Sequence, residues 1–231
     1  MPRAVREQQM LDAAVRTFAQ RGYRKASMDD IAERAGVSKP LVYLYLHSKE
    51  ELFRSCIRRE SAALVAAVTA SIETGAPPDR QLWSGLQGFF RHTAEHPDGW
   101  TLLHVQARTH GRAFAREVAA LRTEIVDLVT RLIAAAVRDS GTATESPLVA
   151  QEVSGLAHAL VGAAESLADW AGGGRSGPTA RETAATLMNF AWAGLERLMR
   201  GERWSADAAD AADAVDAAAA AAAADEELER R

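Results

Sequence analysis

The sequence predicts an all-α fold, and three observations support this expectation. Alanine is plentiful, whereas residues that favour strands are sparse: the 231 residues include only three Tyr and six Phe. Apolar residues recur at intervals of three and four along most of the chain, which is the helical period. No stretch shows the two-residue alternation that is typical of a half-buried strand.

The first two helices are predicted from an apolar face and from their ends. The residues on that face are Leu11, Ala14, Val15, Phe18 and Ala19. We expect the first helix to end at Gly22, because glycine readily takes the conformation that terminates a helix. The segment 27–30, Ser-Met-Asp-Asp, is similar to a capping box and predicts a short second helix that stops at Gly36.

Two further starts follow closely. Ser38 is placed to cap a third helix with Pro40 in its first turn, where the missing N–H costs nothing. Ser48 with Glu51 caps a fourth helix, which runs towards residue 73.

The rest of the chain predicts more helices, separated by breaks at residues 75–78, 96–99 and 172–178. We expect them to start at Asp79, near Phe114, at Ser146-Pro147, and at Thr179, which Glu182 completes as a cap. Residues 204–231 are low-complexity, chiefly Ala and Asp. We expect an acidic, solvated tail without a site.

The composition limits the kind of protein this is. A single cysteine, Cys56, excludes an internal disulfide, and its apolar neighbours favour a small buried residue over a redox sensor. The first residues, MPRAVREQQM, lack the apolar core of a signal peptide, and no apolar run is long enough to span a bilayer. A cytoplasmic protein without a membrane partner is expected.

Charge is unevenly distributed, although the net charge is only −4. Residues 1–60 hold 12 Lys and Arg against 8 Asp and Glu, and they include all three lysines. This bias favours a polyanionic partner for the N-terminal segment.

A helix, the turn Gly-Val-Ser and a second helix make a helix-turn-helix, whose second helix can enter a DNA major groove. Lys39, with Pro40 and Leu41 beside it, is suited to base edges and thymine methyl groups. Tyr43, Tyr45 and Lys49 are suited to phosphate oxygens. The helix start at Ser27 can face a phosphate, and Val42 and Leu46 are spaced to pack inward.

The segment SMDDIAERAGVSKPLVYLYLHSKEELF resembles the DNA-binding domain of the tetracycline-repressor (TetR) family over residues from about 8 to 57. The resemblance implies a helix-turn-helix DNA-binding domain at 1–57, with its motif at about 27–46. A helical ligand-binding and dimerisation domain would occupy 58–203. Two positions depart from the family pattern: Leu46 replaces a usual aromatic, and Leu41 a common small residue. The DNA-binding residues it implies are Ser27, Ser38, Lys39, Pro40, Leu41, Tyr43, Tyr45 and Lys49.

This resemblance predicts a ligand-responsive transcriptional regulator, a repressor that binds a pseudo-palindromic operator as a homodimer and is released by a small-molecule inducer. The dimer interface would be built from residues 147–170 and 179–200, where small residues permit close helix approach. Those residues are Gly155, Ala159, Gly162, Ala163, Ala191 and Gly194.

The inducer pocket is predicted in the second domain, where large aromatics and a few polar groups gather. A pocket needs such residues, but so does any core. The candidate ligand-binding residues are Trp83, Phe90, Trp100, His104, Arg108 and Trp170. One stripe of the helix that starts at 146–147 carries His158, Gly162, Glu165 and Asp169. This stripe indicates either a solvated edge or a site that binds a cationic ligand.

The alternative is a small hydrolase. His92, Glu95 and His96 spell H-x-x-E-H, which on a helix would place both imidazoles on the face that zinc needs. However, Pro97 ends that helix at once, and the sequence has no Gly-x-Ser-x-Gly elbow or phosphate loop. We therefore expect no enzyme, no metal site and no cofactor.

Overall fold

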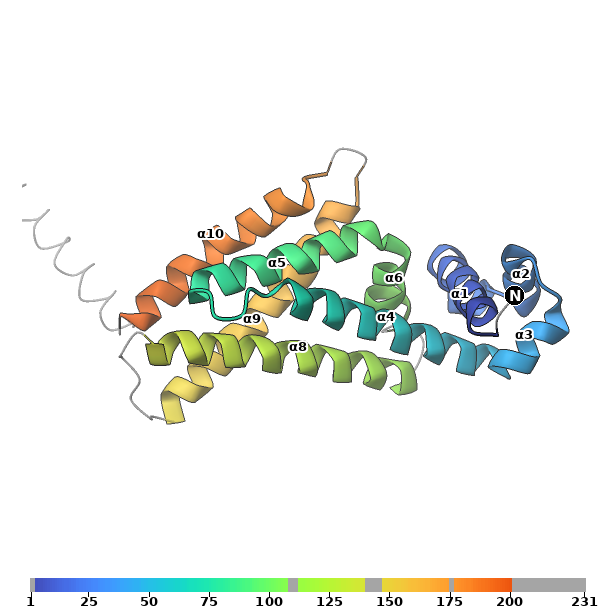
Figure 1. The fold of residues 1–231 in the computed structure, drawn as a ribbon, viewed down its shortest axis with the longest axis horizontal. Helices are drawn as coiled ribbons and strands as arrows, with labels where there is room; N and C mark the ends of the chain where they lie inside the picture. The colour runs from blue at the N-terminus through green and yellow to red at the C-terminus, as the bar shows by residue number, and fades with distance from the viewer. Residues whose placement is uncertain (1–2, 108–111, 140–146, 175–176, 201–231) are drawn as a thin grey trace, which may run out of the picture.

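The computed structural model describes residues 3–107, 112–139, 147–174 and 177–200 (Figure 1). Every regular element in these ranges is a helix, which confirms the all-α prediction. A small N-terminal group lies at one end of the molecule and comprises α1 (Arg3–Lys25), α2 (Met28–Ala35) and α3 (Lys39–Leu46). Helix α4 (Lys49–Ser71) runs from this group into a larger helical group.

The larger group holds most of the chain. Its elements are α5 (Pro78–Glu95), α6 (Pro97–Thr101), the π-helix η1 (Leu102–Gln106), α8 (Arg112–Asp139), α9 (Pro147–Gly172) and α10 (Ala180–Met199). Helix α4 packs on α5 and α8, α9 packs on α8, and α10 packs on α5. None of the described helices is long and apolar enough to cross a membrane. The predicted tail at 204–231 lies outside the described residues.

Local signals in the sequence determine several helix ends. Ser27 and Asp30 form the predicted capping box, with each side chain accepting a hydrogen bond from the other residue's backbone N–H at 3.1 Å. Gly36 ends α2 in the left-handed conformation with φ of 66°, and Gly22 interrupts α1 at φ 76°. Both values suit glycine, which has no Cβ to clash. Ser48 caps α4 through the N–H of Glu51, also at 3.1 Å.

Two predicted caps are wrong in detail. Ser38 occupies the N-cap position of α3, but its side chain makes no capping hydrogen bond. The start of the helix is instead favoured by Pro40 in its first turn, whose backbone angle φ is already helical. Asp79 lies inside the first turn of α5, whose N-cap is Pro77. Its carboxylate still lies where the helix dipole favours negative charge.

An aromatic cluster joins the small group to the large one. Phe53 on α4 contacts Phe18 and Tyr23 of α1, with ring centroids 4.9 and 4.8 Å apart. Phe114, at the start of α8, contacts Phe53 at 4.7 Å and Tyr23 at 5.3 Å. Phe18 and Phe53 are completely buried. Helix α1 of the N-terminal group therefore packs directly on α8, a helix of the larger group.

Candidate DNA-binding face and ligand cavity

Helix α3 presents an exposed face opposite a buried one. Val42 and Leu46 are buried, as the sequence predicts, and α3 packs on α2 and α4. Lys39, Pro40 and Tyr43 are exposed on the other side, whereas Leu41 is half-buried. This arrangement leaves Lys39, Pro40 and Tyr43 of α3 accessible to a groove.

Lys39 pairs with an acidic neighbour at the start of α2. Its Nζ lies 2.9 Å from Oδ2 of Asp29, and this hydrogen bond and charge raise the pKa of Lys39. Both side chains are exposed, so the pair contributes little to stability and can exchange for a contact with DNA.

Lys49 lies over the end of α1. Its Nζ donates a hydrogen bond to the carbonyl oxygen of Arg24 at 3.2 Å and lies 4.7 Å from the ring centroid of Tyr23. Partial burial lowers the pKa of Lys49. The lysine thus helps to dock α4 on α1, a role that the sequence did not suggest.

The remaining predicted DNA-binding residues have defined surroundings. The Ser27 hydroxyl is used by the capping box, so the free N–H groups at the α2 start, and not this side chain, remain for a phosphate. Tyr45 is half-buried, and the Arg3 guanidinium lies 5.1 Å from its ring centroid. Ser38 is exposed at the turn before α3.

Leu44 is an exposed residue of α3 that sequence reasoning missed. Leu44 is 68% exposed on α3. An apolar side chain in this position can contact a thymine methyl group. Its spacing, four residues after Pro40 and outside the stripe of Val42 and Leu46, could have revealed it.

Replacing Lys49 with alanine is expected to weaken binding to operator and to unrelated DNA by similar factors, because a phosphate contact carries no sequence information. The slope of log affinity against log salt should flatten by about one unit. Fluorescence anisotropy over a salt series measures this, with Arg80→Ala on the distant helix α5 as the control. An unchanged slope for Lys49→Ala would leave the lysine with its structural role alone.

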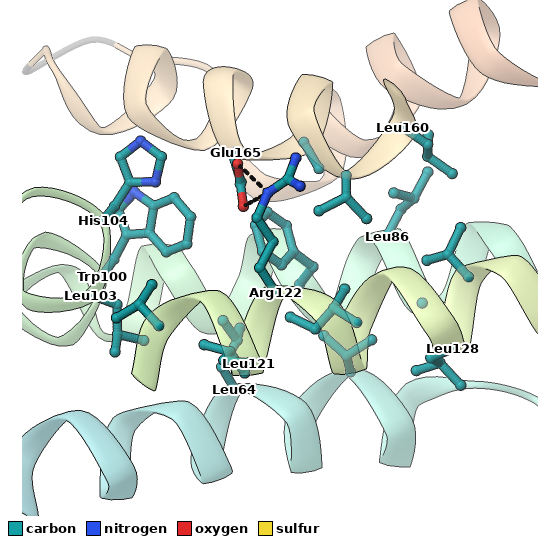
Figure 2. A pocket seen from close by; sticks show the side chains of 18 of the residues that line it. Leu64, Leu86, Trp100, Leu103, His104, Leu121, Arg122, Leu128, Leu160 and Glu165 are labelled. Carbon is teal, nitrogen blue, oxygen red and sulfur yellow. Dashed lines mark hydrogen bonds and ion pairs between the residues drawn. The ribbon is translucent and has the colours of Figure 1, made fainter. Parts of the chain in front are cut away.

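An apolar cavity of about 310 Å³ lies within the larger group, between α4, α5, α8 and α9 (Figure 2). This volume is at the lower end of the range for small-molecule sites. Leucine, valine, isoleucine and alanine make most of its walls. Examples from each helix are Leu64, Leu86, Leu121, Leu128 and Leu160.

The predicted ligand-binding residues do not all line this cavity. Trp100 and His104 do. Phe90 is buried and borders a separate hollow, and Trp83 is half-buried against the core. Trp170 is 62% exposed and lies outside the cavity lining. Arg108 lies outside the described residues.

At one end of the cavity, Asp169 of α9 contacts two of the lining residues. Its carboxylate accepts hydrogen bonds from Nε1 of Trp100 at 2.7 Å and from Nε2 of His104 at 2.9 Å. The indole and imidazole rings stack with centroids 4.9 Å apart. One member of the polar stripe predicted on this helix therefore fixes the two aromatic side chains of the cavity wall.

Arg122 and Glu165 bring charge into the apolar cavity, and the sequence did not single out Arg122. Nε of Arg122 lies 3.1 Å from Oε1 and 3.3 Å from Oε2 of Glu165, across the cavity from α8 to α9 (Figure 2). The signal was available: Arg122 lies four residues after Val118 and three before Ile125, on the apolar face of its helix.

The histidine pair that motivated the hydrolase alternative has an ordinary environment. The rings of His92 and His96 lie 4.5 Å apart, and burial, then the charge of His96, lowers the pKa of His92. In the ranges that the structure covers, no three His, Cys, Asp or Glu side chains are arranged to hold a metal ion. Cys56 is completely buried, as expected, and burial raises the pKa of its thiol.

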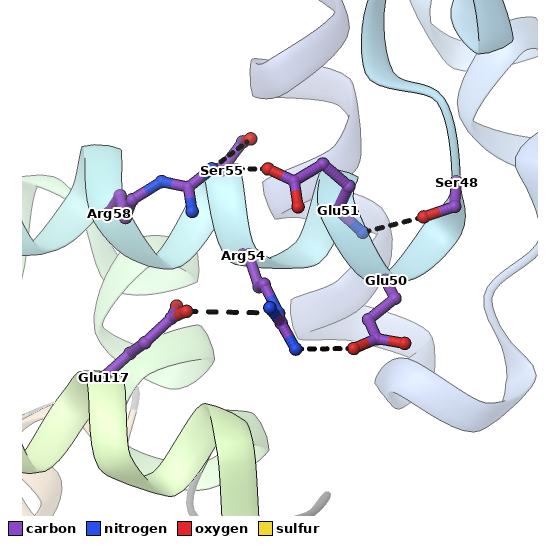
Figure 3. A network of polar contacts seen from close by, with 7 residues as sticks. All are labelled: Ser48, Glu50, Glu51, Arg54, Ser55, Arg58 and Glu117. Atoms are coloured by element: carbon purple, nitrogen blue, oxygen red, sulfur yellow. Dashed lines mark hydrogen bonds and ion pairs between the residues drawn. The ribbon is translucent and has the colours of Figure 1, made fainter.

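A polar network ties the start of α4 to α8 (Figure 3). Arg54 contacts Glu50 at 2.6 Å and reaches Glu117 of α8 at 4.0 Å. Arg58 contacts Glu51, whose N–H is capped by Ser48. Helix α4, which follows α3, is thus connected to the cavity-lining helix α8 by ion pairs and by aromatic packing.

Comparison with known proteins identifies the family. Residues 10–56 match the model described as bacterial regulatory proteins, tetR family, and residues 78–194 match that of the tetracyclin repressor-like C-terminal domain. The transcriptional activator FasR of Mycolicibacterium smegmatis is 32% identical over 200 residues, 86% of this chain and 86% of its own.

Solved structures agree. A TetR-like regulator from Rhodococcus sp. RHA1 is 39% identical, covers 85% of this chain and 98% of its own, and has a TM-score of 0.71. FadR of Bacillus subtilis, solved in complex with stearoyl-CoA, shares the fold at 18% identity and a TM-score of 0.63, over 80% of this chain and 96% of its own. The chain belongs to the TetR family of transcriptional regulators.

Proposed function

We propose that the chain is a ligand-responsive transcriptional regulator, in which an apolar small molecule in the α4–α5–α8–α9 cavity controls operator binding. One observation carries the proposal: α4 connects the candidate DNA-binding helices to the cavity. Its first turn packs beside the DNA-binding helices, and Leu64, Val68 and Ile72 at its other end line the cavity. A ligand that shifts these residues acts on the angle of the DNA-binding helices.

The proposed direction of regulation is repression. Repression requires only that the protein occupy DNA at a promoter, whereas activation also requires a productive contact with RNA polymerase. The relative FasR is named an activator. A promoter fused to a reporter therefore decides the direction: expression that rises when the gene for this chain is deleted supports repression, and expression that falls supports activation.

We further propose that the working unit is a homodimer formed through α9 and α10. Gly155, Ala159 and Gly194 are exposed on these helices, and a Cβ at either glycine would meet nothing within 4 Å. Phe190 of α10 is 78% exposed. Gly162, in contrast, faces Arg122 of its own chain. Two-fold symmetry then requires a pseudo-palindromic operator.

Recovery of genomic DNA fragments on the purified chain, followed by sequencing, tests the proposal directly. Fragments that share a dyad-symmetric motif support a dimeric, sequence-specific regulator. Recovery of fragments without a common motif would contradict it. The matched control is a Lys39→Ala, Tyr43→Phe double variant, which we expect to lose the enrichment.

Coupling between cavity and operator should be reciprocal, because linkage requires each ligand to change the affinity for the other by the same factor. We expect saturating operator DNA to weaken inducer binding, typically about 5- to 150-fold. Calorimetry of an identified inducer, with and without operator, measures the factor. Equal affinities in the two titrations would mean that the cavity does not regulate DNA binding.

A further inference from the structure

Arg122 places a cation in a mostly aliphatic cavity lining, and its side chain is 36% exposed. Among the residues that line the cavity, the charged ones are Arg122 and Glu165, and most of the others are aliphatic. Water can solvate the exposed part of the guanidinium, but donors that a bound apolar ligand screens from water need acceptors on that ligand. The way in which Glu165 meets Arg122 therefore decides what the site can bind.

Glu165 uses only one of the three guanidinium nitrogens. Both of its oxygens approach Nε, at 3.1 and 3.3 Å. The usual strong pairing instead joins two guanidinium nitrogens to two oxygens in parallel. In the part of the chain that the structure describes, the two terminal nitrogens of Arg122 make no hydrogen bond or ion pair.

Glycine leaves room beside these terminal nitrogens. A Cβ on Gly162 of α9 would lie 3.7 Å from Nη2 of Arg122, so no side chain covers the guanidinium at that position. The fork formed by Nη1 and Nη2 presents donors in one plane, which is the geometry that matches a carboxylate.

We propose that Arg122 is the residue that recognises an anionic head group, and that the ligand is an apolar chain ending in a carboxylate. This inference rests on the proposed ligand-sensing function and specifies its ligand class. The apolar walls enclose the chain, and the terminal nitrogens of Arg122 donate to the carboxylate. Glu165 stays on Nε and holds the guanidinium in place.

The same arrangement gives Glu165 two opposing effects. It neutralises Arg122 and orients it, but its negative charge also repels an incoming carboxylate. Replacing Glu165 with glutamine keeps an acceptor for Nε and removes the repulsion. Glu165→Gln should therefore bind an anionic ligand more tightly than the wild-type chain does.

The test compares decanoate with methyl decanoate, which share the chain and differ in charge, by titration calorimetry on the full chain below micellar concentrations. We expect the wild type to prefer decanoate by roughly 10- to 100-fold, the value of hydrogen bonds to a charged group. Arg122→Met should lose this preference and keep its affinity for the ester. Arg131→Met, an exposed arginine of the same helix, should behave as wild type.

Each other outcome is decisive. Equal affinity of the wild type for acid and ester overturns the head-group role of Arg122 but leaves an apolar-ligand sensor standing. No binding of either probe overturns both proposals for this class of ligand. If Arg122→Met loses both probes together, or Glu165→Gln fails to tighten decanoate while both variants keep the wild-type circular dichroism spectrum, Arg122 is structural and the inference is wrong.

Discussion

Replacing Phe53 with alanine is expected to lower the free energy of unfolding by about 3–5 kcal/mol, the usual cost of removing a fully buried aromatic side chain. Phe53 is completely buried and contacts Phe18, Tyr23 and Phe114 with ring centroids less than 5 Å away. Its loss opens a void between α1, α4 and α8. Neighbouring rings on three helices cannot all move in to fill it.

Urea denaturation measures this effect, at one fixed protein concentration because association changes apparent stability. The matched control is Leu44→Ala, which removes an apolar side chain from an exposed position on the neighbouring helix α3. It should change stability by no more than about 0.5 kcal/mol. If Phe53→Ala lowers the free energy of unfolding by less than about 1 kcal/mol, the aromatic cluster does not hold the two groups of helices together.

The DNA-binding half was predictable because its signals are local. The Ser27–Asp30 capping box and the left-handed Gly36 each lie within a few residues of the helix end they set. Val42 and Leu46 lie one helical turn apart, so the packed and exposed faces of α3 followed from spacing alone. The structural role of Lys49 was harder to predict, because its contact with Arg24 depends on how α4 crosses α1.

The cavity was less predictable because its lining is assembled from α4, α5, α6, η1, α8 and α9. An aromatic residue on an apolar stripe lines a cavity or fills the core according to how distant helices pack, and a single helix does not record this. Trp100 lines the cavity, whereas Phe90 and Trp83, chosen by the same reasoning, do not. The clearer signal was a charge on an apolar face. Arg122 is such a residue, and its partner Glu165 lies 43 positions away.

Replacing Phe190 with aspartate is expected to raise the dimer dissociation constant by roughly 30-fold or more, the effect of losing one interface hot spot. In the proposed dimer, the exposed ring of Phe190 packs against the partner beside the small residues of α9 and α10. An aspartate there must bury an unpaired charge. Sedimentation over a concentration series measures the shift, with Ala120→Asp on exposed α8 surface as the charge-matched control.

Operator binding should fail together with the dimer. A monomer places one recognition helix in one major groove, so it loses the second half-site and the joint affinity of two linked sites. A palindromic operator should therefore be bound far more weakly by Phe190→Asp, while a single half-site is bound as well as by the wild type. Phe190→Leu should keep both properties, because it keeps an apolar contact. If Phe190→Asp remains dimeric and binds the full operator normally, the interface lies on another face of the molecule.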